Sequence, residues 1–212
     1  MDAYVYNAED LPHKQANEAD ELLSRGVCLG PLHGIPHGLK DIISVPEYRT
    51  TWGSKLLKIK FLTLKLGFTK VLVAKLVSGP LAYDDIWFGG RTRNPLDIEE
   101  FSTGSSAGPA ACTSAGMVPF AIGSETVGSM TLPTSRCSVM ALRQRFALSV
   151  EDELGPSCRT TTDCVVVLGA IRGKDPVELV GMPVIVVPTG LTDISVTDHH
   201  RQRLPIDELG PD

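Results

Sequence analysis

Apolar and polar positions along this chain alternate between patterns typical of helices and patterns typical of buried strands. Residues 12–25 carry apolar side chains at helical spacing, with a proline in the first turn and a glycine after the last, and they predict a helix. Residues 106–115 are rich in Ala and Ser, which predicts a helix that packs closely. Residues 160–171 begin with Thr-Thr-Thr-Asp, a capping sequence, and predict a third helix that a glycine ends. The apolar positions of the first predicted helix are Ala16, Ala19, Leu22 and Leu23.

Short apolar runs between these segments predict strands. Residues 71–77 and 184–187 form apolar runs that are β-branched in part and typical of buried strands, and residues 117–122 predict another strand despite a proline. Residues 31–38 alternate Gly with Pro and predict a loop, so that Lys40 would begin or follow a turn. Strands alternating with helices indicate an α/β fold with a mostly parallel or mixed sheet covered by helices.

Length and charge narrow the class of protein. With 212 residues, 42% of them hydrophobic, the chain is long enough for one domain with a buried core. We predict a single domain over residues 1–192 and a polar tail over residues 193–212. The formal net charge is −5, and the basic residues are scattered apart from a modest cluster at 55–70. Direct binding of nucleic acid is not expected, because neutralising phosphates requires clustered Lys and Arg.

The sequence carries no sign of a membrane or secretory destination. No apolar run approaches the roughly 20 residues of a membrane span, and residues 1–4 lack the basic and apolar parts of a secretory signal. The five cysteines follow no framework of spacings, which favours reduced thiols, and two of them are predicted to pack in the core, Cys158 and Cys164. We therefore predict a cytoplasmic protein. The remaining cysteines are Cys28, Cys112 and Cys137.

Two turns rich in serine and glycine, together with one lysine, carry the candidate chemistry. Residues 104–108 read Gly-Ser-Ser-Ala-Gly, and residues 123–129 read Gly-Ser-Glu-Thr-Val-Gly-Ser. Upstream, Lys40 lies in the glycine-punctuated segment 34–41. Small residues let backbones approach closely and present N–H groups to an anion. A lysine and two hydroxyls supply a base, a relay and a nucleophile, so the combination indicates acyl transfer.

The order and spacing of these segments resemble a known family. The motifs G-x-P-x-G-x-K-D, G-S-S-x-G and S-E-T-x-G-S occur in this order and are similar to those of the amidase signature family, serine hydrolases that use a Ser–Ser–Lys triad. The resemblance implies that Lys40 is the general base, that Ser105 is a bridging serine on a cis peptide bond, and that Ser129 is the nucleophile. The segment from Ser105 to Ser129 aligns without a gap, and the resemblance covers most of the chain.

The resemblance also implies the reaction, which is cleavage of an amide C–N bond through an acyl-enzyme on Ser129. The substrate would be a small-molecule amide, and neither a metal nor an organic cofactor is implied. A lysine acts as a base only when neutral, so the pKa of Lys40 must fall by about 3 units from its usual value of about 10.4. A facing carboxylate would oppose this, but adjacent residues on an extended segment point apart, so Asp41 is expected to face elsewhere. The backbone N–H groups expected to hold the oxyanion belong to Thr126, Val127, Gly128 and Ser129.

The nucleophile turn departs from the family pattern at one position. The family favours Gly-Gly-Ser, whereas this chain has Val127-Gly128-Ser129. A β-branched residue is an outlier if its backbone φ is positive, and it crowds the oxyanion site if φ is negative. We therefore expect Val127 to lower activity. Thr131 and Pro109 also depart from the family, which often has arginine and a small polar residue at these positions.

Length sets this chain apart from the family, whose members are about twice as long. Family segments are missing near residues 54–71, 142–154 and 176–177, so the chain resembles a shortened member with a truncated amidase-signature-like core. Three alternatives to an active amidase therefore remain open. They are a catalytically dead remnant, a glutaminase like the one that feeds ammonia to a glutamyl-tRNA amidotransferase, and an incorrect gene prediction. A remnant with uncovered apolar surface would favour a homodimer.

Two other patterns do not carry a function. Residues 104–108 also fit G-x-S-x-G, the nucleophile elbow of α/β-hydrolases, with acidic and histidine residues at 193–200 in the right order. That elbow must follow a buried strand, and residues 98–102 do not predict one. His33 and His37 would share a metal only on a helix, which the intervening glycine and proline break, so no metal site is expected.

Overall fold

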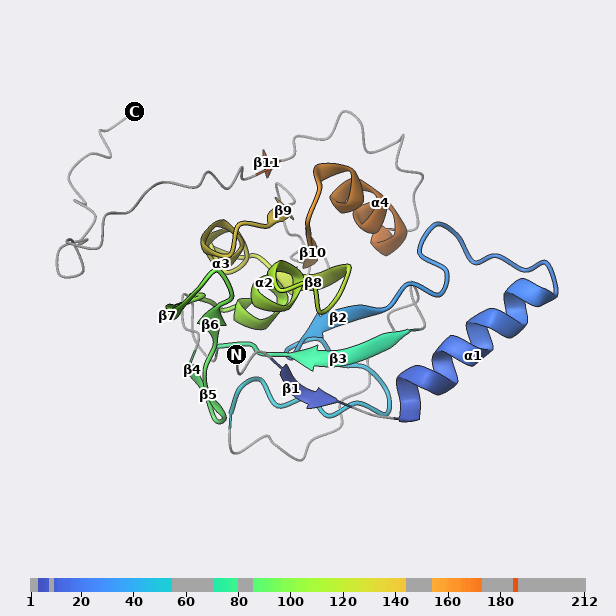
Figure 1. The fold of residues 1–212 in the computed structure, drawn as a ribbon, viewed down its shortest axis with the longest axis horizontal. Helices are drawn as coiled ribbons and strands as arrows, with labels where there is room; N and C mark the ends of the chain where they lie inside the picture. The colour runs from blue at the N-terminus through green and yellow to red at the C-terminus, as the bar shows by residue number, and fades with distance from the viewer. Residues whose placement is uncertain are drawn as a thin grey trace.

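A computed structural model of the chain describes residues 4–7, 10–54, 71–79, 86–143, 154–172 and 185–186. Within them, a seven-stranded sheet forms the centre of the fold, in the order β1-β3-β2-β8-β10-β9-β11 (Figure 1). Its strands are β1 (Tyr4–Asn7), β2 (His37–Lys40), β3 (Leu72–Leu76), β8 (Phe120–Ser124), β9 (Met140–Arg143), β10 (Leu154–Cys158) and β11 (Ile185–Val186). Two small ribbons pair β4 (Ile86–Trp87) with β5 (Gly90–Arg91), and β6 (Arg93–Asn94) with β7 (Asp97–Phe101). The helices are α1 (Asp10–Ser24), α2 (Ala107–Ser114), α3 (Thr131–Arg136) and α4 (Thr161–Arg172).

The middle of the sheet is parallel and its flanks are antiparallel. β2 pairs in parallel with β3 on one side and with β8 on the other. β1 joins β3 antiparallel, and β10, β9 and β11 continue antiparallel from β8. The predicted α/β class therefore holds with a mixed sheet. Because β2 and β8 are parallel neighbours, their last residues, Lys40 and Ser124, lie at the same edge of the sheet.

Helices pack on both faces of this sheet. Ala121 and Ile122 are consecutive in β8 and therefore point to opposite faces. Ile122 belongs to the largest core cluster together with Val167 of α4, whereas Ala121 belongs to a second cluster with Ala111 and Cys112 of α2. The side chains of α2 are small, which lets this helix lie close over the central strands (Figure 1).

The three helices predicted from sequence are present. α1 overlaps the predicted span, and Gly26 after it has a positive φ of 76°. Of the predicted apolar stripe, Ala19 is buried and Leu23 is 56% exposed, so only part of the stripe faces the core. α2 and α4 match their predictions to within one residue at either end. The cap of α4 is formed as predicted, because Thr160 Oγ1 accepts the N–H of Asp163 at 3.1 Å.

β2 begins earlier than the sequence suggests. The segment 31–38 was predicted as a loop, yet His37 and Gly38 already pair with both neighbouring strands. Pairing on two sides supplies partners for the backbone groups of this glycine- and proline-rich segment, and it outweighs the low strand propensity of the segment. Lys40 is consequently the last residue of a strand and precedes a turn, rather than beginning or following one.

β8 begins later than the sequence suggests. The predicted strand covered residues 117–122, whereas the observed strand begins at Phe120. Pro119 has no N–H to donate to a neighbouring strand, which accounts for the later start. The strand predicted at 71–77 is confirmed as β3.

Several predictions fall on residues outside the described ranges. These include the basic cluster at 55–70, the glycine predicted to end α4, and the polar tail at 193–212; of the strand predicted at 184–187, residues 185–186 are described, as β11. The single domain over residues 1–192 stays a prediction. None of the helices in the described ranges combines the length and apolar character that crossing a bilayer requires.

Candidate active site

Lys40 ends the central strand β2, and it is only 1% exposed. Its Nζ donates hydrogen bonds to Ser105 Oγ at 2.7 Å and to Ser124 Oγ at 2.8 Å. Ser124 is close because β2 and β8 run in parallel and end at the same edge of the sheet. The contact with Ser105 agrees with the sequence prediction, whereas no motif had pointed to Ser124 as a partner of the lysine.

Ser105 lies in the turn that precedes α2. The peptide bond between Gly104 and Ser105 is cis, as the family resemblance implied. The Ser105 carbonyl accepts the N–H of Gly79 at 3.0 Å, and the N–H of Gly108 donates to the Val77 carbonyl at 3.1 Å. These two bonds fasten the turn and the start of α2 to the chain that leaves β3, so the position of the Ser105 hydroxyl is fixed.

Ser106 connects the two serine-rich turns. Its Oγ accepts the N–H of Ser124 at 3.3 Å and donates to the Ser124 carbonyl at 3.2 Å. Its backbone N–H donates to the Ser129 carbonyl at 2.8 Å. This close approach requires a glycine at position 123, because a Cβ there would lie 2.9 Å from Ser106 Oγ. Ser106 therefore fixes the backbone of Ser129 relative to Ser105.

Ser129 lies between β8 and α3 and is 7% exposed. No hydrogen-bond partner of its hydroxyl is found in the part of the chain that the structure describes. Catalytic hydrogen bonds are often long or poorly aligned before substrate binds. The structure thus joins Lys40 to Ser105 directly, and it joins Ser129 to this pair through the backbone of Ser106.

Glu125 holds the turn that carries Ser129, although the sequence analysis assigned it no role. Its buried carboxylate accepts three backbone N–H groups, that of Gly128 on Oε1 and those of Met130 and Thr131 on Oε2, both at 2.8 Å. The last two donors open α3, where N–H groups lack partners within the helix. One carboxylate therefore fixes the backbone on both sides of Ser129.

The predicted oxyanion-hole turn has one donor already in use, since the Gly128 N–H is bonded to Glu125. The Thr126 carbonyl accepts a hydrogen bond from Arg143 Nη2 at 3.3 Å. Gly128 has a φ of 86°, which favours glycine, whereas Val127 is not among the residues with positive φ. Val127 is 62% exposed. Valine is therefore compatible with the backbone here, and its side chain lies at the outer surface of the turn.

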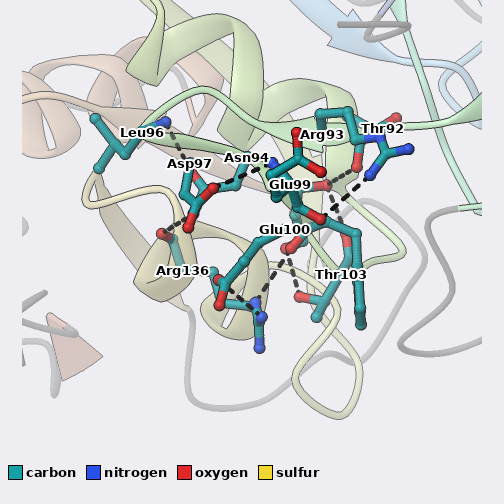
Figure 2. A network of polar contacts seen from close by, with 11 residues as sticks. Thr92, Arg93, Asn94, Leu96, Asp97, Glu99, Glu100, Thr103 and Arg136 are labelled. Carbon is teal, nitrogen blue, oxygen red and sulfur yellow. Dashed lines mark hydrogen bonds and ion pairs between the residues drawn. The ribbon is translucent and has the colours of Figure 1, made fainter. Parts of the chain in front are cut away.

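The end of α3 is tied to the ribbon formed by β6 and β7. Figure 2 shows Arg136 directed at this ribbon. Its Nη2 pairs with Glu100 Oε2 at 3.1 Å, and its Nε donates to the Phe101 carbonyl at 3.2 Å. Asn94 Nδ2 donates in turn to the Arg136 carbonyl at 3.0 Å. The helix that follows Ser129 is thus held at its start by Glu125 and at its end by the ribbon.

A buried ion pair lies beside the turn that follows Lys40. Asp41 Oδ1 and Lys75 Nζ are 3.4 Å apart, and both side chains are fully buried. The Asp41 carboxylate turns toward Lys75 and accepts the Thr51 N–H at 3.0 Å, in agreement with the expectation that it faces elsewhere than Lys40. Burial lowers the pKa of Lys75 to about 8 while Asp41 opposes the shift, and burial raises the pKa of Asp41 while Lys75 opposes that shift.

The two histidines considered as metal ligands have structural contacts instead. His33 Nδ1 accepts the N–H of Leu29 at 2.9 Å, and its Nε2 bonds the Ala19 carbonyl at 2.9 Å. His37 is buried and stacks on Phe120, and burial lowers its pKa to about 4. Over the described ranges, no group of three His, Cys, Asp or Glu side chains could hold a metal ion.

The G-x-S-x-G match and the cysteines can also be compared with the structure. Residues 97–101 do form a strand, β7, but it pairs with β6 outside the main sheet and Ile98 is exposed, so no buried strand precedes the G-x-S-x-G match. All five cysteines are free thiols, and Cys158 and Cys164 lie in the core cluster as predicted.

A cavity of about 350 Å³ lies away from these residues. It is lined by the loop before β2, by the start of β8 and by α4, including Leu32, Phe120 and Val167. Lys40 and Ser124 end the same two strands at the opposite edge of the sheet. The cavity is therefore separate from the lysine and the serines.

Comparison with known proteins agrees with this geometry. The protein-family model described as Amidase matches residues 1–63 and 82–180, more than half of the chain. The chain therefore belongs to the amidase family, the family of the signature motifs around Lys40, Ser105 and Ser129.

Its curated relatives include the A subunit of the Glutamyl-tRNA(Gln) amidotransferase of Geobacillus kaustophilus, 34% identical over 206 residues that cover 84% of this chain and 41% of the relative. The protein of the same description from Moorella thermoacetica is 33% identical over 198 residues, with the same coverage of 84% and 41%. Among solved structures, the native peptide amidase from Stenotrophomonas maltophilia is 30% identical, with a TM-score of 0.72, and the match covers 86% of this chain and 43% of that one. The chain thus spans about two-fifths of the length of these relatives.

Proposed function

We propose that this chain hydrolyses an amide C–N bond, with Ser129 as the nucleophile, Ser105 as the proton relay and Lys40 as the base. The observation that supports this most directly is the 2.7 Å hydrogen bond between Lys40 Nζ and Ser105 Oγ, made by a buried lysine in a chain of the amidase family. A hydroxyl both donates and accepts a proton, which is the property that a relay requires.

The proposed reaction has two steps, in which every proton is returned. The Ser129 oxygen attacks the amide carbonyl carbon while its proton passes to Ser105, whose own proton passes to neutral Lys40. The C–N bond then breaks, and the proton returns through Ser105 to the leaving nitrogen. Water next attacks the ester on Ser129 along the same proton path and releases a carboxylic acid and the free serine. The scheme uses neither a metal nor an organic cofactor.

The oxyanion of the tetrahedral intermediate is proposed to lie against the N–H groups of the nucleophile turn. Of the four predicted donors, the Gly128 N–H already serves Glu125, and the proposal rests on the N–H groups of Val127 and Ser129. Each donor of such a hole contributes a factor of roughly 10²–10³ in rate. Glu125 would support the hole indirectly by fixing the backbone of the turn.

The proposed substrate class is a small-molecule amide, in keeping with the similarity to a peptide amidase. A second candidate is the side-chain amide of glutamine, in a chain that belongs to a larger amidotransferase. It is favoured by the curated relatives, which are described as the A subunit of such an enzyme. Ammonia release from peptide amides and from glutamine, measured side by side, separates the two candidates.

We further propose that the chain works in the cytoplasm and forms a homodimer. Four buried and reduced cysteines suit a reducing compartment. Exposed apolar side chains, among them Leu96, Ile98 and Leu132, would be covered by a second copy. Light scattering of the purified chain tests the assembly, and a monomer mass at micromolar concentration would contradict the dimer.

Labelling with a serine-directed fluorophosphonate tests the proposed nucleophile. The parent chain, Ser129→Ala and Ser135→Ala are treated side by side and examined by intact mass and peptide mapping. Ser135 is a matched control because it is an exposed serine on α3, six residues after the nucleophile. We expect one adduct, on Ser129, in the parent and in Ser135→Ala, and none in Ser129→Ala. A folded parent chain without an adduct would contradict the proposal and leave the catalytically dead remnant as the conclusion.

A further inference from the structure

Asp41 and Lys75 form a buried ion pair that the proposed reaction does not use. Asp41 follows Lys40 directly, and Lys75 lies on β3 beside Leu76, the residue that pairs with Lys40 across the parallel strands. The Asp41 Oδ1 and Lys75 Nζ atoms are 3.4 Å apart, and neither side chain is exposed. A negative and a positive charge are therefore buried together next to the candidate base.

The contacts of Lys75 are those of a counter-ion. Its Nζ faces Asp41 Oδ1 as an ion pair, and it donates hydrogen bonds to the Ile43 carbonyl at 2.5 Å, to Thr50 Oγ1 at 3.1 Å and to the Asp41 carbonyl at 3.4 Å. All of these partners are acceptors that favour the charged form of the ammonium group. Burial opposes that form and lowers the pKa of Lys75 to about 8, with Asp41 acting in the other direction.

The second oxygen of Asp41 is also occupied. Its Oδ2 accepts the Thr51 N–H at 3.0 Å, the Thr51 hydroxyl and the Gly53 N–H at 3.4 Å. Without Lys75, a buried carboxylate adjacent to Lys40 in the chain would stabilise the protonated form of Lys40. With Lys75, the pair has no net charge.

We propose that Lys75 neutralises Asp41 and thereby sets the pH at which Lys40 can accept a proton. This inference rests on the proposed function for its catalytic meaning, because it gives Lys40 the part of the base. Asp41 and Lys75 touch no reacting atom and are positioning residues that act through Lys40.

Within the described residues, the other titratable groups near Lys40 are not expected to set the pH at which it titrates. Glu125, which follows Ser124, binds three backbone N–H groups, none of which belongs to Asp41 or Lys75. His37, at the start of β2, has its pKa lowered to about 4 by burial and is neutral at pH 7. Cys112, on the helix packed over β2, has its pKa raised to about 12 by burial and is neutral as well. The charges of Asp41 and Lys75 can therefore be removed separately, and the effect of each removal on the titration of Lys40 can be measured.

Three variants separate the two charges. Asp41→Asn leaves the positive charge of Lys75, Lys75→Gln leaves the negative charge of Asp41, and the double variant leaves neither. The titration of Lys40 is followed by NMR in chains carrying ¹³C-labelled lysine, with Lys40→Met to assign the signal. The pH dependence of fluorophosphonate labelling at Ser129 is measured on the same samples.

We expect the two single variants to shift the Lys40 titration in opposite directions. It should move down by about one pH unit in Asp41→Asn and up by about one unit in Lys75→Gln, because each variant leaves one unpaired charge buried beside the strand of Lys40. The double variant should titrate within a few tenths of a unit of the parent. The labelling profile should move with the titration, which a purely structural role of the pair would not produce.

Titrations that stay in place, or that move in the same direction in both single variants, would overturn the inference. If neither single variant folds, the double variant decides the matter, because it leaves no unpaired charge beside Lys40. A Lys40 titration displaced by about one pH unit or more in the double variant would then overturn the inference. Opposite shifts without any labelling of Ser129 would instead refute the proposed function while the effect of the pair on Lys40 stands.

Discussion

Lys40 and Lys75 lie on the adjacent parallel strands β2 and β3, and both are buried. They differ in their partners. Lys40 Nζ bonds the hydroxyls of Ser105 and Ser124. Lys75 Nζ bonds two carbonyls and the Thr50 hydroxyl, and it also faces the carboxylate of Asp41, which Lys40 does not. Hydroxyls can pass a proton on, but carbonyls and carboxylates hold an ammonium group in its charged form. The two buried lysines therefore differ in surroundings, and we propose a catalytic role for Lys40 and a structural one for Lys75.

Substitution of Lys40 should produce the largest effect, and it should be an effect on rate. In Lys40→Met, labelling of Ser129 should fall by about 10³-fold, because no base remains to take the proton of the nucleophile. The free energy of unfolding should change little, since methionine fills a similar volume and leaves no buried charge without a partner. Labelling kinetics and urea unfolding of the same protein measure both quantities.

Lys14→Met is the matched control for this variant, because Lys14 is an exposed lysine on α1. It should leave both the labelling rate and the stability unchanged. If the Lys40→Met chain were labelled as fast as the control, Lys40 would not be the base, and the proposed difference between the two buried lysines would be wrong.

Substitution of Lys75 should show the complementary defect, a loss of stability. Lys75→Gln leaves the buried Asp41 carboxylate without its counter-charge, which should lower the free energy of unfolding by about 3 kcal/mol. The double variant Asp41→Asn, Lys75→Gln should recover most of this loss, because it leaves no unpaired charge. Urea unfolding of the parent, the two single variants and the double variant forms a complete cycle. Equal stability of the double variant and Lys75→Gln would show that the loss comes from packing and not from charge.

The smallest effect is expected at Val127, where substitution, like that of Lys40, should change the labelling rate and not the stability. Its side chain is exposed on the turn predicted to form the oxyanion hole, and we expect it to hinder the approach of a substrate carbonyl group. Val127→Gly should therefore raise the labelling rate several-fold at nearly unchanged stability. Leu132→Ala, which trims another exposed apolar residue just after the turn, is the control. A labelling rate that rises equally in both variants, or in neither, would remove the part assigned to Val127.

The sequence predicted the contact between Lys40 and Ser105 better than it predicted the limits of the strands. Lys40 and Ser105 could be paired in advance because motif order constrains which turns meet, and the cis bond before Ser105 was implied by the same resemblance. The limits of the strands were harder to predict. Residues 31–38 are rich in glycine and proline, which favour a loop, although β2 begins within them. Its pairing with two neighbours depends on residues far away in the sequence.

The residues that were missed share a physical reason. Glu125 and Ser106 act on backbone groups that a turn brings close, and no spacing in the sequence reports such contacts. The sequence analysis assigned no role to Lys75, because the apolar residues around it were enough to predict the strand. A charged residue inside a predicted buried strand is the signal that could have identified it, because a buried charge requires a partner.

The two bonds of Lys40 join residues that are 65 and 84 positions apart in the chain. No local segment can form them alone, because closing loops of this length has an entropic cost that is offset only when β2, β8 and the start of α2 have packed. Reactivity of Ser129 would therefore arise late on the folding pathway, together with the centre of the sheet. The labelling rate would then measure the population of chains with an assembled core, and a refolding experiment read by Ser129 labelling would time the closure of the sheet itself.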